Sequence, residues 1–217
     1  MKVILISGKA QHGKDTCGNF LDIELRAKGF STQIMHFGDP VKYVCEKYYN
    51  WDGNKDERGR SILQTVGTEI VRRQDEHFWT DFVGRLARTF DCDYIIIPDW
   101  RFEEEHERLL QWFKFEDIIT IRVERFEKWE EEGEQIPFVN EVMTLSQLHH
   151  RSEIELDNYP CQYHIVNTTF ENFEESKDII RFDTRKYFPK ESRYDNGRSC
   201  CKSKRTDCKG KDVLYTR

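Results

Sequence analysis

Residues 8–16, Gly-Lys-Ala-Gln-His-Gly-Lys-Asp-Thr, contain the clearest chemistry in the sequence, and they follow a short apolar run at residues 1–7. Two glycines separated by four residues are followed directly by Lys14. Glycine lets the backbone turn tightly and approach a ligand closely. Amides that point into such a turn, together with the start of a helix, attract anions. The pattern therefore predicts a phosphate site in which Lys14 brings a cation to the β- and γ-phosphates of a nucleotide.

This is the P-loop pattern with one departure. The usual pattern has Ser or Thr directly after the lysine to place a hydroxyl on Mg²⁺, whereas here Asp15 holds that position and Thr16 follows. An aspartate beside a triphosphate is repelled unless a metal intervenes, so we expect Asp15 or Thr16 to order Mg²⁺ directly or through water. The alternative is that Asp15 occupies the first turn of a helix, where acidic residues are favoured anyway.

The ATP phosphates are expected to contact most of this loop. His12 has two interpretations, because its side chain either faces phosphate or simply fills space within the loop. The predicted cofactor contacts are Gly8, Lys9, Ala10, His12, Gly13, Lys14, Asp15 and Thr16.

Alternating strand and helix patterns surround the loop. Apolar runs predict strands at residues 1–7, 31–37, 94–98, 118–123 and 163–166. Amphipathic or charged stretches predict helices at 15–28, from Pro40 to about 48, at 57–73, after Asp75, and at 103–113, 124–134 and 170–180. Strands separated by helices predict an α/β fold of three layers, in which a mostly parallel sheet has helices on both faces.

The composition limits the function classes. The chain has 217 residues, 37% hydrophobic and 34% charged, which favours one domain. The net charge is −6, while residues 186–217 hold ten Lys and Arg against four Asp and Glu. An acidic main body disfavours nucleic acid as a partner. No apolar run approaches a membrane span, and scattered single cysteines suit a reducing compartment, so we expect a cytoplasmic protein.

Further charged and polar residues that could bind a ligand come after or just before the predicted strands. They lie in residues 39–42, 58–73, 98–103 and 148–153. Open α/β sheets bind ligands at the carboxyl ends of their strands, so these stretches are expected to gather around the phosphate loop.

Together with the loop, these stretches resemble the deoxynucleoside monophosphate kinases of tailed phages over roughly residues 1–185. The resemblance is carried by residues 8–10 and 13–16, 63–68 (LQTVGT), 99–102 (DWRF) and 150–153 (HRSE). It implies a P-loop NTPase fold of the adenylate kinase type, with acceptor-binding helices at about 40–90 and a lid at about 124–152. It also implies ATP and Mg²⁺ as cofactors, a dNMP as small-molecule acceptor, and the host cytoplasm as location. The basic, cysteine-containing tail at 186–217 matches nothing in the family and is expected to be irregular.

Phosphoryl transfer needs positive charge around the moving group and little help from a protein base. On this interpretation the catalytic residues are Lys14, Asp99, Arg101 and Arg151, and Asp99 either holds the water shell of the metal or positions Arg101. Arg101, with Arg72 or Arg73, would grip the acceptor phosphate through guanidinium forks. Arg122, Arg125 and Arg151 would come from the lid. The remaining predicted substrate contacts are Lys42, Gln64, Thr68 and Glu69.

Other interpretations remain open at this stage. Asp99 with Arg101 could form a structural ion pair, and Arg72 and Arg73 could lie on a solvated helix face. The loop alone also fits a kinase that acts on phosphomevalonate or dephospho-coenzyme A, or a P-loop module that binds nucleotide without transferring phosphate. The Asn-Lys-x-Asp base reader of a GTP switch is absent from the sequence. The sequence does not decide whether the chain forms a homodimer.

Overall fold

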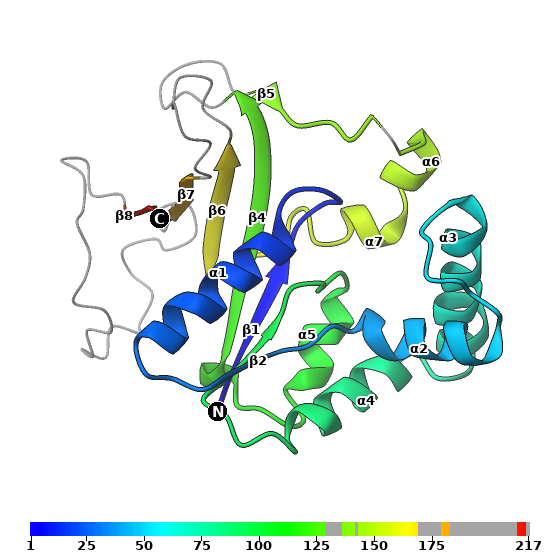
Figure 1. The fold of residues 1–217 in the computed structure, drawn as a ribbon, viewed down its shortest axis with the longest axis horizontal. Coiled ribbons are helices and arrows are strands. Elements are labelled where there is room, and N and C mark those ends of the chain that lie inside the picture. Colours follow the sequence, from blue (N-terminus) through cyan, green and yellow to red (C-terminus); the bar gives the residue numbers. More distant parts are fainter. Residues whose placement is uncertain (129–135, 142, 169–178, 183–211, 216–217) are drawn as a thin grey trace.

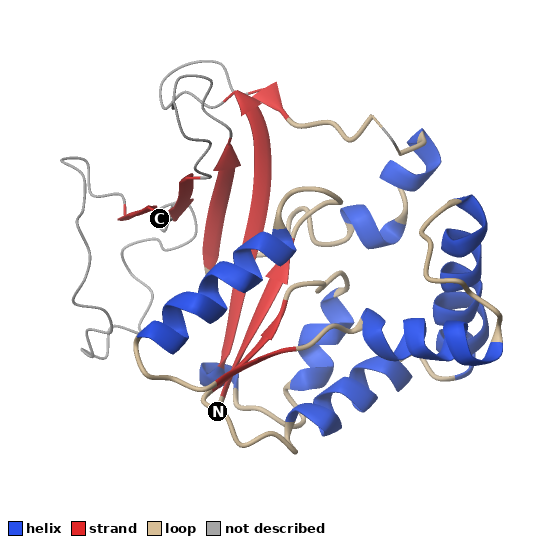
Figure 2. Ribbon diagram, in the orientation of Figure 1, coloured by secondary structure: helices blue, strands red, loops and turns tan. Residues whose placement is uncertain are grey.

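A computed structural model describes residues 1–128, 136–141, 143–168, 179–182 and 212–215. Its centre is one sheet with the strand order β2-β3-β1-β4-β6-β7-β8. Figure 2 shows the strands in red, with the helices around them in blue. The five strands at its core are parallel to one another: β2 (Thr32–Ile34), β3 (Tyr94–Ile97), β1 (Lys2–Ser7), β4 (Ile118–Lys128) and β6 (Tyr163–Thr168). Antiparallel strands β7 (Ile179–Phe182) and β8 (Asp212–Tyr215) extend one edge, and β5 (Ile136–Pro137) pairs with the far end of β4.

Strand β1 lies between β3 and β4 and is buried on both faces. Val3 is paired with Ile95 on one side and with Ile118 on the other. Alternate β1 residues belong to different cores, because Val3 and Leu5 face one cluster and Ile4 and Ile6 face the other. Continuous apolar runs are typical of parallel strands that helices cover on both faces.

Helices cover both faces of the sheet. On one face α1 (Lys14–Ala27) packs through Cys17 and Phe20. On the other face lie α4 (Phe78–Ala87) and α5 (Glu103–Leu109), which contribute Val83, Ala87 and Leu109. The predicted fold class, a mostly parallel α/β sheet with helices on both faces, is confirmed.

A helical lobe lies beside the sheet and has its own small core (Figure 1). It consists of α2 (Gly38–Tyr48), α3 (Glu57–Gln64) and a π-helix, η1 (Thr65–Arg72), that continues α3 without a break. Cys45, Trp51 and Val66 are buried within it. Two short helices, α6 (Leu145–Leu148) and α7 (Arg151–Ile154), lie on the same side of the P-loop as the helical lobe in Figure 1. A 3₁₀ turn at Phe115–Asp117 leads into β4.

Three sequence-based expectations are wrong in part. Residues 124–128 do not begin a helix but continue β4, where they pair with β6 and β5. Ile179 and Ile180 belong to β7 instead of ending an acidic helix, and the tail contains β8 at Asp212–Tyr215. In each case pairing with a neighbouring strand overrides the local pattern of charged residues. The remaining residues of these stretches, 129–135, 169–178 and most of the tail, lie outside the described residues.

The single expected helix at 57–73 is instead α3 followed by η1, and the expected strand at 31–37 shortens to Thr32–Ile34. Among the described residues, no helix combines the length and the apolar character that crossing a membrane would require.

Gly84 in α4 offers a test of the helix packing beneath the site. Alanine normally stabilises a helix relative to glycine by about 1 kcal/mol. Here a Cβ on Gly84 would lie 2.6 Å from Cε3 of Trp112, which follows α5. We therefore expect Gly84→Ala to lower the free energy of unfolding by about 1–3 kcal/mol, measured by urea denaturation. Asn19→Ala, at an exposed position of α1, is the control; stabilisation by both variants would contradict this packing.

Candidate functional site

The loop between β1 and α1 requires its two glycines. Gly8 has φ 151°, and a Cβ there would lie 2.4 Å from the carbonyl oxygen of Val123 on β4. Gly13 has φ 93°, and a Cβ there would lie 2.6 Å from Nδ2 of Asn167 on β6. Both positions therefore exclude other residues through backbone conformation and through contact with neighbouring strands. This is the turn that the glycine spacing predicts.

Lys14 is buried and folds back over the loop. Its Nζ donates hydrogen bonds to the carbonyl oxygens of Gly8 (2.7 Å) and Lys9 (2.8 Å). Burial, with a smaller contribution from the nearby Arg101, lowers the pKa of Lys14 to about 8. Anionic phosphate would favour the charged ammonium and so oppose this shift.

Two cavities meet at Lys14. The first, of about 330 Å³, lies over the start of α1 and is lined by Thr16, Arg125 and Asn167 together with loop residues. The second, of about 520 Å³, extends toward the helical lobe. Gln11, Lys14 and Asp15 line both cavities. A ligand in either space would therefore meet the same lysine.

The second cavity brings together residues from five parts of the chain. Predicted site residues that line it are Ala10, Lys14, Asp15, Lys42, Gln64, Thr68, Arg72, Asp99 and Arg101. Gly13 and Thr16 line the first cavity but not the second. Gly8, Lys9, His12, Glu69, Arg73 and Arg151 line neither of these two cavities.

The π-helix η1 forms one wall of the second cavity. Gln64, Thr68 and Arg72 recur every fourth residue and all line the cavity. Hydrogen bonds between residues five apart widen a π-helix, and such segments often occur at functional sites. The sequence predicted all three as candidate substrate contacts but gave no sign of the wider helix.

Asp99, at the carboxyl end of β3, anchors the helical lobe to the sheet. Its Oδ1 accepts a hydrogen bond from the Phe37 amide (2.8 Å), and its Oδ2 accepts one from the Gly38 amide (2.9 Å) where α2 begins. Each carboxylate oxygen has a second lone pair, so a further role toward metal-bound water stays a prediction.

Glu153 connects three elements, although no role was predicted for it. Its Oε2 accepts a hydrogen bond from the amide of Ala10 in the loop (2.8 Å), and its Oε1 pairs with Nη1 of Arg101. Burial raises the pKa of Glu153, but Arg101 and the Ala10 amide outweigh burial, so the pKa lies below its usual value. The carboxylate thus holds α7, the loop and Arg101 together. The signal for Glu153 in the sequence was its place in the stretch at 150–153.

Two further arginines of the predicted site are, like Arg101, already paired with carboxylates. Arg72 pairs with Glu104 and, at 2.7 Å, with Glu105. Arg151 pairs with Glu155, and both guanidiniums lie over the ring of Phe102, at 4.6 Å for Arg72 and 5.2 Å for Arg151. Arg122 is likewise buried on β4 and paired with Asp157 instead of belonging to a lid. These contacts reduce the charge that each arginine offers to a ligand.

His36 lies between two aspartates and was missing from the predicted site. Its Nε2 is 3.3 Å from Oδ1 of Asp15, and its Nδ1 is 3.2 Å from Oδ2 of Asp39. The hydrogen bond with Asp15 raises the pKa of His36 and lowers that of Asp15. Because ionised carboxylates only accept hydrogen bonds, this arrangement favours the imidazolium form. Its signal in the sequence was its position just after β2, at the edge where ligands bind.

His12 fills space between the loop and β4. Its Nδ1 accepts a hydrogen bond from the Arg125 amide (3.1 Å), and its ring meets Phe138 edge to face. Burial, aided by Lys14 and Arg122, lowers the pKa of His12 to about 4. His12 is thus neutral at pH 7, and its ring is packed against protein.

Comparisons with known proteins add little to this geometry. No protein-family model matches the chain, and no curated protein matches it. Among solved structures, the Mycobacterium tuberculosis APS kinase CysC Cys556Ala mutant matches with 16% identity and a TM-score of 0.31, over 56% of this chain and 74% of that chain. A likeness of this size carries no argument about activity. The fold assignment rests on the strand order and on the loop itself.

The lowered pKa of His12 predicts a loss of stability in acid. Its proton is bound more tightly in the unfolded chain (pKa 6.5) than in the folded one (about 4). His12 therefore destabilises the fold progressively as pH falls from 6.5 toward 4, by about 2 kcal/mol at pH 5. Urea denaturation at pH 7.5 and pH 5 should show a smaller loss for His12→Gln than for the unchanged protein.

His149→Gln, at an exposed position after α6, is the matched control and should follow the unchanged protein. Equal acid sensitivity of all three proteins would contradict the burial of a neutral His12.

Proposed function

We propose that this chain is a P-loop kinase that transfers the γ-phosphoryl group of ATP to the phosphate of a small acceptor, a deoxynucleoside 5′-monophosphate. The observation that carries the proposal is the meeting of two cavities at Lys14. A phosphotransferase must hold a donor and an acceptor on opposite sides of one moving group. A simple nucleotide-binding module has no need of the second space.

The donor phosphates belong in the first cavity. The backbone of the loop and the start of α1 supply amides and a positive helix end, and Lys14 supplies a cation. The Thr16 hydroxyl and the Asp15 carboxylate, whose pKa is lowered, form an oxygen donor set suited to Mg²⁺. A bound Mg²⁺ neutralises charge on the β- and γ-phosphates. Arg125 lines the same space.

The acceptor belongs in the second cavity. Its walls combine apolar side chains, Val41, Leu63 and Trp79, with the polar groups of Gln64 and Thr68. A nucleobase needs this combination, with apolar surface against its ring and hydrogen-bonding groups at its edge. Together with the resemblance over residues 63–68, the mixed lining favours a dNMP over an isoprenoid phosphate.

Transfer requires no protein base, since the acceptor phosphate is already ionised near pH 7. Lys14 stabilises charge on the moving phosphoryl group. Arg101 lies at the end of β3, within the acceptor cavity, where its guanidinium can bind a phosphate oxygen. Glu153 holds both Arg101 and the Ala10 amide and so sets their separation before substrates arrive.

The reaction class is tested by measuring ADP release from Mg-ATP with each of the four dNMPs, the four NMPs, phosphomevalonate, dephospho-coenzyme A, and no acceptor. We expect release that depends on at least one dNMP. Release without any acceptor would indicate an ATPase. Release only with phosphomevalonate or dephospho-coenzyme A would retain the kinase and overturn the nucleotide assignment.

Arg101→Ala separates transfer from ATP binding. We expect the transfer rate to fall about 100-fold or more while the dissociation constant for ATP, measured by calorimetry, changes little. Arg85→Ala, at an exposed position of α4 that does not line the cavity, is the control. Unchanged turnover in Arg101→Ala would remove Arg101 from the transferring machinery.

A further inference from the structure

The cations of the acceptor cavity differ in whether a carboxylate already neutralises them. Lys42 pairs with Asp39, Arg72 with Glu104 and Glu105, and Arg101 with Glu153. Lys14 donates to two carbonyl oxygens. Lys55 and Arg60 also line the cavity, and neither has a carboxylate within ion-pair distance among the residues that the structure describes. An incoming anion can bind these two side chains without first displacing a carboxylate.

The segment that carries Lys55 is held in place by its own contacts. Trp51 is buried, and its Nε1 donates a hydrogen bond to the carbonyl oxygen of Asn54 (2.7 Å). Asp56 caps α3 by accepting a hydrogen bond from the Gly59 amide (2.7 Å). A Cβ on Gly59 would lie 1.9 Å from the Asn54 oxygen, so the segment packs directly against the first turn of α3. These contacts therefore hold in place the backbone from which the Lys55 side chain extends.

Arg60 is oriented by the same segment. Its Nε donates a hydrogen bond to the carbonyl oxygen of Lys55 (3.0 Å). The bond occupies one edge of the guanidinium and leaves the two Nη groups available for a ligand. A guanidinium held in this way suits the two-point recognition of phosphate oxygens.

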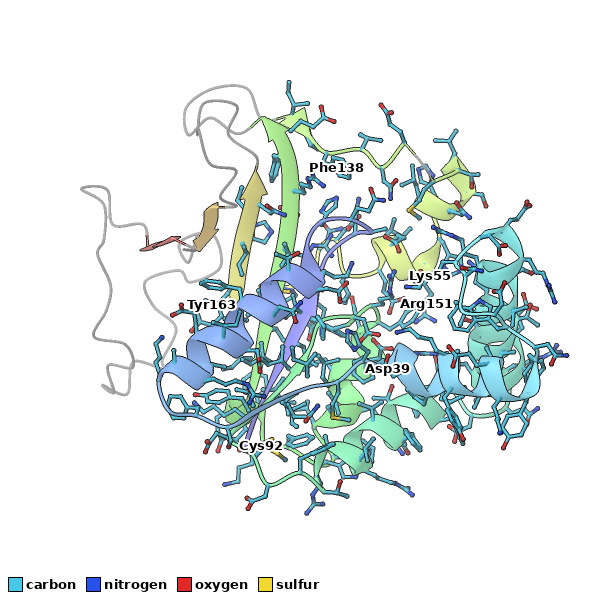
Figure 3. The ribbon with its side chains drawn as sticks, in the orientation of Figure 1. Asp39, Lys55, Cys92, Phe138, Arg151 and Tyr163 are labelled. Carbon is cyan, nitrogen blue, oxygen red and sulfur yellow. The ribbon has the colours of Figure 1, made fainter. Side chains whose placement is uncertain are left out.

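The pair faces the phosphate loop across the cavity. Lys55 and Arg60 come from the helical lobe, whereas Lys14 and Asp15 come from the loop, and all four line the same space. The charge of Lys55 contributes to the lowered pKa of Asp15, which is consistent with this placement. In the view of Figure 3, Lys55 lies in the region between α7 and the helices of the lobe.

We propose that Lys55 and Arg60 bind the phosphate of the acceptor, a phosphomonoester dianion, and hold it toward Lys14. The sequence-based prediction gave this task to Arg101 together with Arg72 or Arg73. Arg72 is held by two carboxylates, Arg101 is paired with Glu153, and Arg73 does not line the cavity. This inference rests on the proposed function in that it names the groups that recognise the acceptor. The pair sets affinity for the acceptor, and Lys14 with Arg101 acts on the transferred group.

The test uses the full chain and the variants Lys55→Met, Arg60→Gln, Arg60→Lys and the Lys55→Met/Arg60→Gln double variant. Arg58→Gln is the matched control, because Arg58 lies in the same helix, is exposed and does not line the cavity. We expect Lys55→Met and Arg60→Gln each to raise the acceptor KM about tenfold, because each removes one positive charge. The KM for ATP should change less than about twofold, and Arg60→Lys should recover part of the loss.

Equal thermal midpoints for all variants would show that the fold is intact. An acceptor KM in the double variant within about twofold of the unchanged protein would overturn the proposal, as would an equal effect of Arg58→Gln.

A second measurement keeps the inference separate from the proposed function. The chain is saturated with Mg²⁺ and a non-hydrolysable ATP analogue, and inorganic phosphate is titrated by calorimetry. Phosphate binding that the double variant weakens about tenfold supports the site even if no nucleotide accepts phosphate in the ADP assay. Phosphate binding that is undetectable in the unchanged protein, or equal in the double variant, overturns the site.

Discussion

The burial of β1 between β3 and β4 is the constraint on which the site depends. Because the strand is apolar on both faces and paired on both edges, its end is fixed relative to two neighbours. The loop that follows packs so closely against β4 that the Gly8 backbone lies against the Val123 carbonyl. The position of Lys14 is therefore set by the sheet core and not by the loop alone. Hydrophobic burial thus determines where the cation lies.

Carboxylates then determine which cationic side chains of the site are already paired before a ligand binds. The site contains several buried or half-buried arginines, and an unpaired buried charge is costly. Glu104, Glu105 and Glu153 meet this need for Arg72 and Arg101, and they also fix the start of α5 and the position of α7. The same contacts therefore hold Arg72 against two carboxylates and orient Arg101 through Glu153. They leave Lys55 and Arg60 without a carboxylate partner among the residues that the structure describes.

Local sequence patterns predicted those features of the fold and the site that are determined by residues close together in the chain. The two glycines and the lysine predicted the loop, and apolar runs predicted the parallel strands, because both signals come from a few adjacent residues. The contact of Glu153 with Ala10 spans 143 positions in the chain and has no local signature. The same holds for His36 between two aspartates and for the pairing state of each cation. Residues 124–128 were expected to be helical because they are rich in charge, but pairing with β5 and β6 keeps them in β4.

The π-helix in the acceptor wall has a consequence for how this cavity can change shape. Its winding contains more residues in each turn than an α-helix would, and the extra length is stored within eight residues of continuous helix. Rewinding η1 as an α-helix would rotate Thr68 relative to Arg72. It would also change the length of this cavity wall along the helix axis. The register of one helix can thus redefine which side chains meet the ligand while the sheet and the phosphate loop stay in place.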